Sequence, residues 1–280
     1  MLTQLDNYQF PLVLPLFAVM DYQLAPLSVL HGCSQGDVFV DDAAHPRAAM
    51  LRVSHRYYLA GSPENGTFNE DLRRLFADRI FPTVRARGDG GFLIYYGEAG
   101  WEPVIEGTIL AGCEVYPGPR QYYELDLDLP GWQPPSAPAV PEDMHLQIVD
   151  RALVDRQDLS GLSELTEEMC SERETVNEFL EKSFGKVILR ENKVITWCLS
   201  EYNLGERCEV GIATAEEYRR RGLSTITGLA FIEQARANGI RRIGWHCWTR
   251  NEGSVSAARR LNFDLVKELQ AYYVAVRPGE

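Results

Sequence analysis

The chain has 280 residues, which is long for one compact domain and comfortable for two. Its 45% hydrophobic and 24% charged residues exclude a largely disordered chain. The formal net charge of −12 argues against a nucleic-acid partner, whose phosphates would be repelled, and suits a cationic substrate such as an amine. Six scattered cysteines show no metal-ligand spacing, so we expect no metal, reduced thiols and a cytoplasmic location.

The first part of the chain alternates helix-like and strand-like patterns. Residues 10–20 are apolar, lack a preceding basic segment and contain prolines, which predicts a buried helix rather than a signal peptide or a membrane span. Further helices are expected at 25–31, 68–87 and 101–110, with Pro82 kinking or ending the second of these. Strands are expected at 37–40, 49–59, 91–96, 113–116 and 122–127.

Prolines crowd the segment between residues 129 and 143. Each one fixes φ and removes a backbone donor, so this segment is predicted to be neither helix nor sheet. The prolines are Pro130, Pro134, Pro135, Pro138 and Pro141. We expect a semi-rigid linker over 129–143 that separates an N-terminal α/β domain (1–128) from a C-terminal domain (144–280).

The C-terminal domain has an α+β order. A strand at 145–153 and a broken helix at 159–184 are expected to precede strands at 186–190, 194–199 and 208–214. Glu191 and Asn192 predict a hairpin turn between the first two of these three strands. A helix at 225–235, a strand at 242–247, a helix that Asn251 opens and a strand at 265–276 follow.

The loop over residues 218–224, which reads YRRRGLS, predicts an anion site. It lies between a strand and the start of a helix, where the first backbone N–H groups are unpaired and the helix dipole is positive. Gly222 allows a ligand to approach the backbone closely. The expected ligand is a phosphate or a pyrophosphate, although an arginine cluster before a helix is also typical of a solvated surface.

The loop and the order of elements around it resemble the GNAT superfamily of acyl-CoA-dependent N-acyltransferases. Arg219, Gly222 and Ser224 fit the superfamily's R-x-x-G-x-G/A pyrophosphate loop, with serine at the last small position. Asn251 and Ser254 fit its next helix. The run EVGIAT and the strand GWHC are similar to the subgroup of zwittermicin-resistance acetyltransferases. The resemblance implies an α+β, GNAT-like mixed sheet flanked by helices, preceded by a smaller α/β domain that could be a degenerate GNAT-like half.

The resemblance also implies how acetyl-CoA would bind. The strand before the loop would hold the pantetheine arm and the acyl carbonyl, and Ile212 could instead be a core residue. The loop amides would hold the pyrophosphate, and the side chains of Arg219 and Arg221 would add charge-assisted contacts. Asn251 would orient the cofactor or a water, cap its helix, or do both. The implied residues are Ile212, Ala213, Thr214, Arg219, Arg220, Arg221, Gly222, Leu223, Ser224, Thr225, Asn251 and Ser254.

Direct attack by an amine on the thioester requires a base that removes a proton from the amine. Glu209, Glu201 and His246 are the candidates, and each could instead serve as a surface charge, a fold-stabilising hydrogen bond or a structural histidine. The superfamily's usual proton donor is a tyrosine on the helix after Asn251, and that position is Ala258 here. Ser254, Ser256 or water would have to replace it, or the thiolate would leave unprotonated.

Three functions are compatible with the sequence. The first is an acetyl-CoA-dependent N-acetyltransferase that modifies a small-molecule amine, such as an antibiotic or another metabolite. The second acetylates a protein or peptide amine, and the third is a non-catalytic acyl-CoA-binding sensor. No nucleic-acid or membrane partner is expected, and the N-terminal domain would contribute to an acceptor pocket or to a homodimer contact.

Overall fold

The computed structural model describes residues 2–130, 132–136 and 138–277, which form two compact units. Unit 1 takes in the chain up to Arg120 and again from Leu269 onward, and unit 2 takes in Gln121–Glu268. The chain therefore passes between the units within two strands, β6 (Val115–Asp126) and β12 (Asp264–Ala275).

This division differs from the expected one. The proline-rich segment lies inside unit 2, and its described residues contain no helix or strand, as the prolines predict. The last strand returns to unit 1 because β12 pairs antiparallel with β5 (Gly91–Tyr96), with Tyr272 opposite Ile94. Hydrogen-bond partners so distant in sequence leave no local signal, whereas prolines do.

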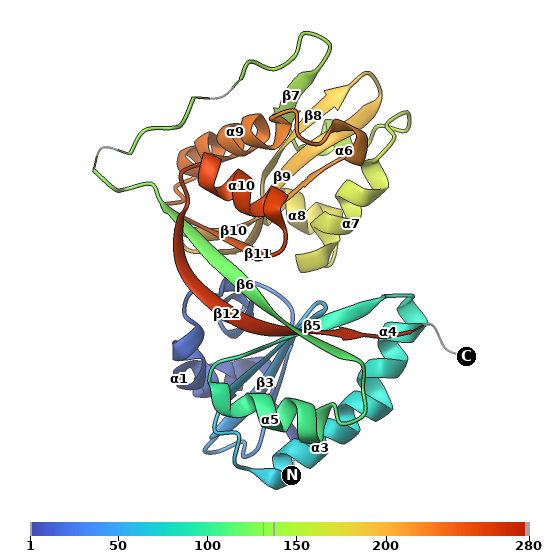
Figure 1. Ribbon diagram of the computed structural model, residues 1–280, viewed down its shortest axis with the longest axis vertical. Coiled ribbons are helices and arrows are strands. Elements are labelled where there is room, and N and C mark those ends of the chain that lie inside the picture. Colours follow the sequence, from blue (N-terminus) through green and yellow to red (C-terminus); the bar gives the residue numbers. More distant parts are fainter. Residues whose placement is uncertain (1, 131, 137, 278–280) are drawn as a thin grey trace. The chain divides into compact units, whose positions relative to one another are not determined.

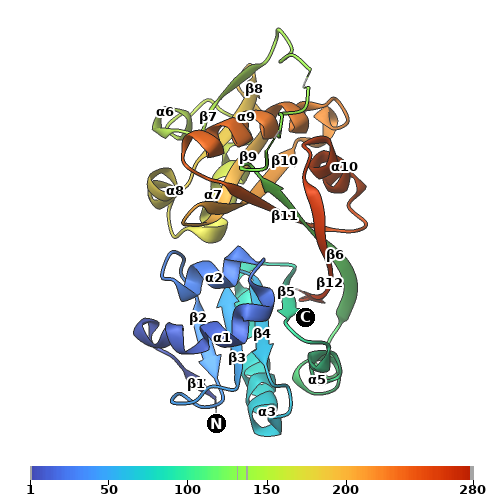
Figure 2. The ribbon, with the colours of Figure 1, turned by 90° about the vertical axis from the view of Figure 1, so that its left-hand side faces the viewer.

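Unit 1 is a mixed sheet with helices on both faces (Figures 1 and 2). Its strands follow the order β1-β2-β3-β4-β5-β12. Strands β4 and β5 are parallel, whereas the described pairs β1–β2, β2–β3, β3–β4 and β5–β12 are antiparallel. The strands are β1 (Thr3–Gln4), β2 (Asp37–Val40), β3 (Ala48–Val53), β4 (Arg56–Gly61) and β5. The helical segments are η1 (Asn7–Val13), α1 (Leu14–Phe17), η2 (Ala18–Met20), α2 (Leu24–Leu30), α3 (Gly66–Leu75), η3 (Phe76–Ile80), α4 (Phe81–Arg87), η4 (Ala99–Trp101), α5 (Glu102–Val104) and η5 (Ile105–Ile109).

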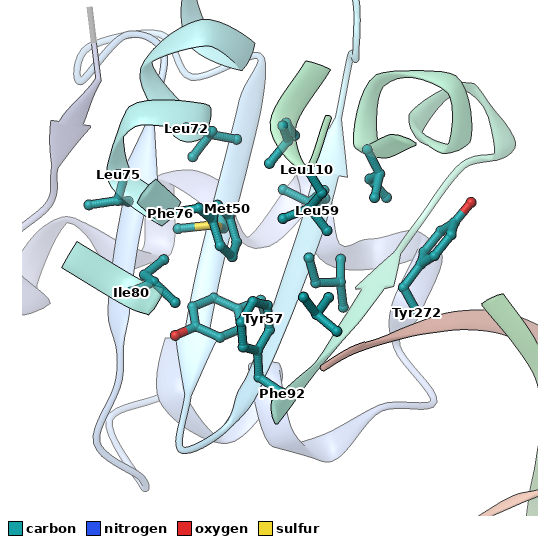
Figure 3. Close-up of a cluster of buried hydrophobic side chains, with 14 of the residues drawn as sticks. Met50, Tyr57, Leu59, Leu72, Leu75, Phe76, Ile80, Phe92, Leu110 and Tyr272 are labelled. Atoms are coloured by element: carbon teal, nitrogen blue, oxygen red, sulfur yellow. The ribbon is translucent and has the colours of Figure 1, made fainter. Parts of the chain in front are cut away.

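One face of the unit 1 sheet packs on α3, η3, α4 and η5 through a large apolar cluster (Figure 3). Met50, Tyr57 and Phe92 supply the sheet side of this cluster, and Leu72 and Phe76 supply the helix side. On the other face, α2 packs on β3 and α1 on β4. The predicted buried helix at 10–20 is thus a run of short helical segments, with Val13 and Phe17 fully buried.

Three predictions for this part of the chain differ in the structure. The single strand expected at 49–59 is a hairpin of β3 and β4 that turns at Ser54, which has a φ of 52°. Of the two outcomes expected at Pro82, the helix expected at 68–87 does not end there: it continues as α4, and the π-helical segment η3 interrupts the regular α-helical pattern just before the proline. Because proline has no N–H to donate, the backbone departs from the regular α-helical hydrogen-bond pattern at this point. The two strands expected near 113–116 and 122–127 are one continuous strand, β6.

Unit 2 is also a mixed sheet, in the order β6-β11-β10-β9-β8-β7 (Figure 1). Its strands are β6, β7 (His145–Ile148), β8 (Gly185–Arg190), β9 (Lys193–Leu204), β10 (Arg207–Thr214) and β11 (Arg242–Trp248). Its helical segments are α6 (Arg151–Val154), α7 (Leu162–Glu172), α8 (Val176–Lys182), η6 (Glu216–Tyr218), α9 (Leu223–Ala237) and α10 (Glu252–Arg260). The predicted break in the 159–184 helix and the hairpin at Glu191 are confirmed, whereas the strand expected at 145–153 ends at Ile148 and is followed by α6.

The two faces of the unit 2 sheet carry different helices. Trp245, Cys208 and Cys198 pack in a cluster with residues of α9 and α10. Val187 and Leu199 pack in a cluster with residues of α6, α7 and α8. Leu199 is paired with Gly211 across β9 and β10. Residues of β10 at alternate positions from Gly211, such as Glu209, therefore face the same side of the sheet as α7 and α8.

The element order of unit 2 repeats that of unit 1. In each, three antiparallel strands are followed by a long helix, a strand parallel to the third, a short helical segment and a final strand. In unit 1 these elements run from β2 to β6, and in unit 2 from β8 to β12. The predicted α+β mixed sheet flanked by helices is confirmed.

Candidate active site

Strands β10 and β11 separate partway along their length. Strand β10 pairs with β9 from Arg207 to Thr214, but with β11 only over Arg207–Glu209 in the described register. Residues 210–214 therefore form an open edge on the β11 side. Ile212, Ala213 and Thr214, the predicted pantetheine strand, lie in this open part, and Ile212 also packs against the core cluster beneath α9 and α10.

The loop after β10 presents free backbone donors. Within the described part of the chain, the N–H groups of residues 220–224 have no hydrogen-bond acceptor, and helix α9 has no side-chain cap. Arg220 and Gly222 adopt left-handed conformations, with φ of 60° and 78°, which turn the backbone at this point. The N–H of Thr225 was also expected to be available to the pyrophosphate. It instead donates to the Gly222 carbonyl at 3.0 Å.

Positive charge surrounds these donors. Arg219 Nε donates to the Thr214 carbonyl at 3.2 Å, and this contact fastens the loop to the open end of β10. The guanidinium of Arg221 lies 5.1 Å from the centre of the Tyr218 ring and donates to the Glu217 carbonyl at 3.1 Å. All three loop arginines are exposed, so their charge is available to an anion that approaches the loop.

Glu209 and His246 meet on the α7–α8 face of the sheet. The parallel register places Glu209 beside Gly244, so His246, two residues on, points to the same face. Glu209 Oε1 lies 3.3 Å from His246 Nε2, and Glu209 is only 5% exposed. The Tyr122 ring packs on the His246 ring with centroids 4.7 Å apart. Two candidates chosen separately from the sequence thus form one pair.

Tyr122, on β6, lies beside the Glu209–His246 pair. The sequence did not predict it as a site residue. Its hydroxyl donates to Glu124 at 2.7 Å. Burial raises the pKa of Tyr122, and the hydrogen bond to Glu124 raises it further, so the phenol stays protonated at neutral pH. No sequence pattern points to Tyr122 or Glu124, because β6 becomes a neighbour of β11 only through long-range strand pairing.

Glu201, the third candidate base, lies on the same face. It is paired with Glu209 across β9 and β10 and is 6% exposed. Its carboxylate covers Gly211: a Cβ at this glycine would overlap Glu201 and lie 3.4 Å from Oε1 of Glu168. Three carboxylates, those of Glu168, Glu201 and Glu209, therefore gather along this face, which favours a cationic ligand.

Asn251 and Ser254 stabilise the junction between β11 and α10. The Asn251 side chain accepts a hydrogen bond from the Ser254 N–H at 3.2 Å, which confirms its role as the helix N-cap. Ser254 Oγ accepts a hydrogen bond from Trp245 Nε1 at 2.8 Å. Ala258 is completely buried in the cluster beneath α10, so a tyrosine at this position would have to displace core side chains.

A family model for GNAT acetyltransferases matches residues 15–272. The chain belongs to this family. A relative from Bacillus subtilis, the uncharacterized N-acetyltransferase YdfB, is 24% identical over 250 residues, which are 88% of each chain. In structure, the chain resembles a GCN5-related N-acetyltransferase-like protein from Streptococcus suis, with a TM-score of 0.71 at 23% identity over 95% of this chain and 98% of that one. A tandem GNAT protein from the clavulanic acid biosynthesis pathway has the same fold, with a TM-score of 0.58 at 12% identity over the whole of both chains.

The chain is thus a GNAT N-acetyltransferase, and proteins of this family use acetyl-CoA. The geometry of the loop suits that substrate, because free N–H groups and guanidinium groups lie together at a helix start, where a diphosphate binds favourably. Among the described helices none is long and apolar enough to cross a membrane. The described residues contain no group of three or more His, Cys, Asp or Glu side chains placed to hold a metal ion.

Proposed function

We propose that unit 2 transfers an acetyl group from acetyl-CoA to the amine of a small molecule, such as an antibiotic or another metabolite. The observation that carries the proposal is the open edge of β10 between a set of free loop amides and the Glu209–His246 pair. The amides of residues 220–224 would bind the diphosphate, and the side chains of Arg219 and Arg221 would add charge. The thioester would then lie along Ile212, Ala213 and Thr214.

The acceptor amine would enter from the carboxylate-rich α7–α8 face. Glu168, Glu201 and Glu209 would attract it as an ammonium ion, and Glu209 would take one proton so that the nitrogen gains a free electron pair. The nitrogen then attacks the thioester carbonyl carbon, the C–S bond breaks as the amide forms, and the nitrogen loses its second proton to water, which can pass it on to the departing sulfur. His246 would hold the Glu209 carboxylate in place and accept the proton from it, since their side chains are 3.3 Å apart.

The departing thiolate needs a proton from a group other than residue 258. Ser254 is a suitable donor, because its oxygen accepts the Trp245 hydrogen bond and its own hydrogen stays available. Ser256 and water are the alternatives. A thiolate can also leave unprotonated, because its conjugate thiol has a pKa of only about 8–9.

The test is an assay of CoA release with acetyl-CoA and a panel of small amines, polyamines and peptide amines. The proposal expects turnover with at least one small amine, and a loss of about a hundredfold or more in kcat for Glu209→Gln, with CoA affinity unchanged. Turnover with peptides alone would favour the protein-acetylating alternative. No turnover with any amine, together with tight CoA binding, would favour the sensor, which the buried Ala258 also supports.

We also propose that unit 1 is a degenerate GNAT-like half. Its element order matches that of unit 2, but the connection between β4 and α3 is short, and the Asn65 side chain caps α3 by accepting from the Phe68 N–H at 3.2 Å. The end of β4 corresponds to the open end of β10 in unit 2. There the Trp101 indole donates to the Gly61 carbonyl at 3.0 Å, so this carbonyl already has a partner within the chain. Membership of the zwittermicin-resistance subgroup, a cytoplasmic location and a homodimer stay predictions.

A further inference from the structure

Unit 1 contains a cavity of about 600 Å³ that the acetyltransferase chemistry does not use. It lies at the end of the sheet where β3 turns into β4, and it is bounded on the other side by η3 and α4. Its size is within the range of about 300–1,000 Å³ that small-molecule sites have. In the repeated element order, acetyl-CoA would belong at the opposite end of β4, so this cavity is not the unit 1 counterpart of the proposed CoA site.

The floor of the cavity carries an ordered row of polar side chains. Asp37, Arg52 and Tyr57 are paired across β2, β3 and β4 and therefore point to the same face. Asp37 fixes the Arg52 guanidinium, whose Nε and Nη2 lie 2.6 and 2.5 Å from its Oδ2. The cationic end of Arg52 is thus held in position before any ligand arrives.

Tyr57 points an unused hydroxyl into the cavity. The residue is only 4% exposed, and its ring packs against Phe76 and Phe92 (Figure 3). The hydroxyl lies at the edge of this cluster on the side of Ile80, and it forms no hydrogen bond within the described part of the chain. Burial raises the pKa of Tyr57 to about 12, so the group remains a hydrogen-bond donor at neutral pH. The hydroxyl therefore faces the space of the cavity as a hydrogen-bond donor that a ligand can use.

The helix side of the cavity adds positive charge and apolar surface. Arg79 and Arg87 line it, and neither forms an ion pair with a described residue. With Arg52 they outnumber the two aspartates of the lining, although the whole chain has a net charge of −12. Ile80, from the π-helical segment η3, supplies apolar surface beside them.

We infer that this cavity binds a small organic anion with an apolar body, whose carboxylate lies among Arg52, Arg79 and Arg87 and accepts a hydrogen bond from Tyr57. The apolar body lies against Ile80 and the aromatic cluster. The ligand differs in charge from an acceptor amine, so the cavity is a second binding site and not a part of the transferase site. It serves as a site for an effector or for a carried metabolite of this chemical class.

The test is calorimetry with 1-naphthoate and octanoate as probes, performed at saturating CoA so that the proposed cofactor site is filled. Each wild-type chain is expected to bind one probe anion. The double variant Arg79→Ala/Arg87→Ala should bind it at least about tenfold more weakly, because two charge-assisted contacts are lost. The neutral isostere 1-naphthamide should bind wild type at least about tenfold more weakly than 1-naphthoate.

Arg85→Ala is the matched control, because Arg85 lies on the same helix but does not line the cavity and contacts Phe81 instead. Its probe affinity should equal that of wild type. Thr83→Trp, which fills the cavity from α4, should abolish probe binding while thermal unfolding confirms a folded chain. The inference is overturned if neither probe binds, if the amide binds as well as the carboxylate, or if the double variant binds like wild type.

Discussion

Gly222→Ala separates the binding role of the loop from its structural role. Gly222 has a φ of 78°, and an alanine in this left-handed conformation costs about 1–2 kcal/mol of stability. The added Cβ would meet only Pro138 Cγ among the described atoms, at an ordinary 3.5 Å, so no clash enlarges that cost. The methyl group would, however, stand beside the free N–H groups and keep a diphosphate away. Losing one charge-assisted hydrogen bond costs about 1.5–3 kcal/mol, which is about a tenfold to hundredfold increase in Kd for CoA.

Gly239→Ala is the control for this experiment. Gly239 follows the other end of the same helix with a φ of 82°, and a Cβ there would have no described atom within 4 Å. Both variants should therefore lose about the same stability in thermal unfolding, while calorimetry shows weaker CoA binding for Gly222→Ala alone. If the two variants bind CoA equally well, the free amides at residue 222 do not hold the diphosphate and the reasoning fails.

The remaining predictions concern the base, the stoichiometry and the thiols. His246→Asn should lower kcat by about tenfold to a hundredfold in single-turnover assays and leave CoA affinity unchanged; an unchanged kcat would remove His246 from the mechanism. Calorimetry should find one CoA per chain, because Asn65 already caps the equivalent helix of unit 1, and a stoichiometry of two would contradict the degenerate-half proposal. Burial raises the pKa values of Cys198 and Cys208 well above the ordinary 9.0, so the unfolded chain loses their protons first as the pH rises. Stability should therefore fall above pH 9.0 in urea titrations, and Cys208→Ala should make this fall shallower; a variant with the same slope would refute the assignment.

Local sequence signals predicted most of unit 2. The loop with Gly222, the hairpin at Glu191 and the cap at Asn251 depend on neighbouring residues, and all three features are present. The hairpin turn at Ser54 was missed because serine is not a residue that favours a positive φ, and the alternating apolar pattern continues across it. The return of β12 to unit 1 was missed because strand pairing over such sequence separations has no local signature.

The catalytic candidates show the same limit. Glu209 and His246 could be chosen by residue type and by place along a strand, but their meeting depends on the parallel register of β10 and β11. Tyr122 and Glu168 could not be chosen, because they reach the site from β6 and α7 only after the sheet has formed. The cavity beside Tyr57 likewise arises from several strands and helical segments that come together only in the folded chain.

A crystal structure of the chain with acetyl-CoA tests the central claim most directly. The account predicts that diphosphate oxygens lie within hydrogen-bond distance of the N–H groups of residues 220–224, with the acetyl group beside the open edge of β10. Acetyl-CoA bound elsewhere, with the amides of this loop facing solvent, would contradict it.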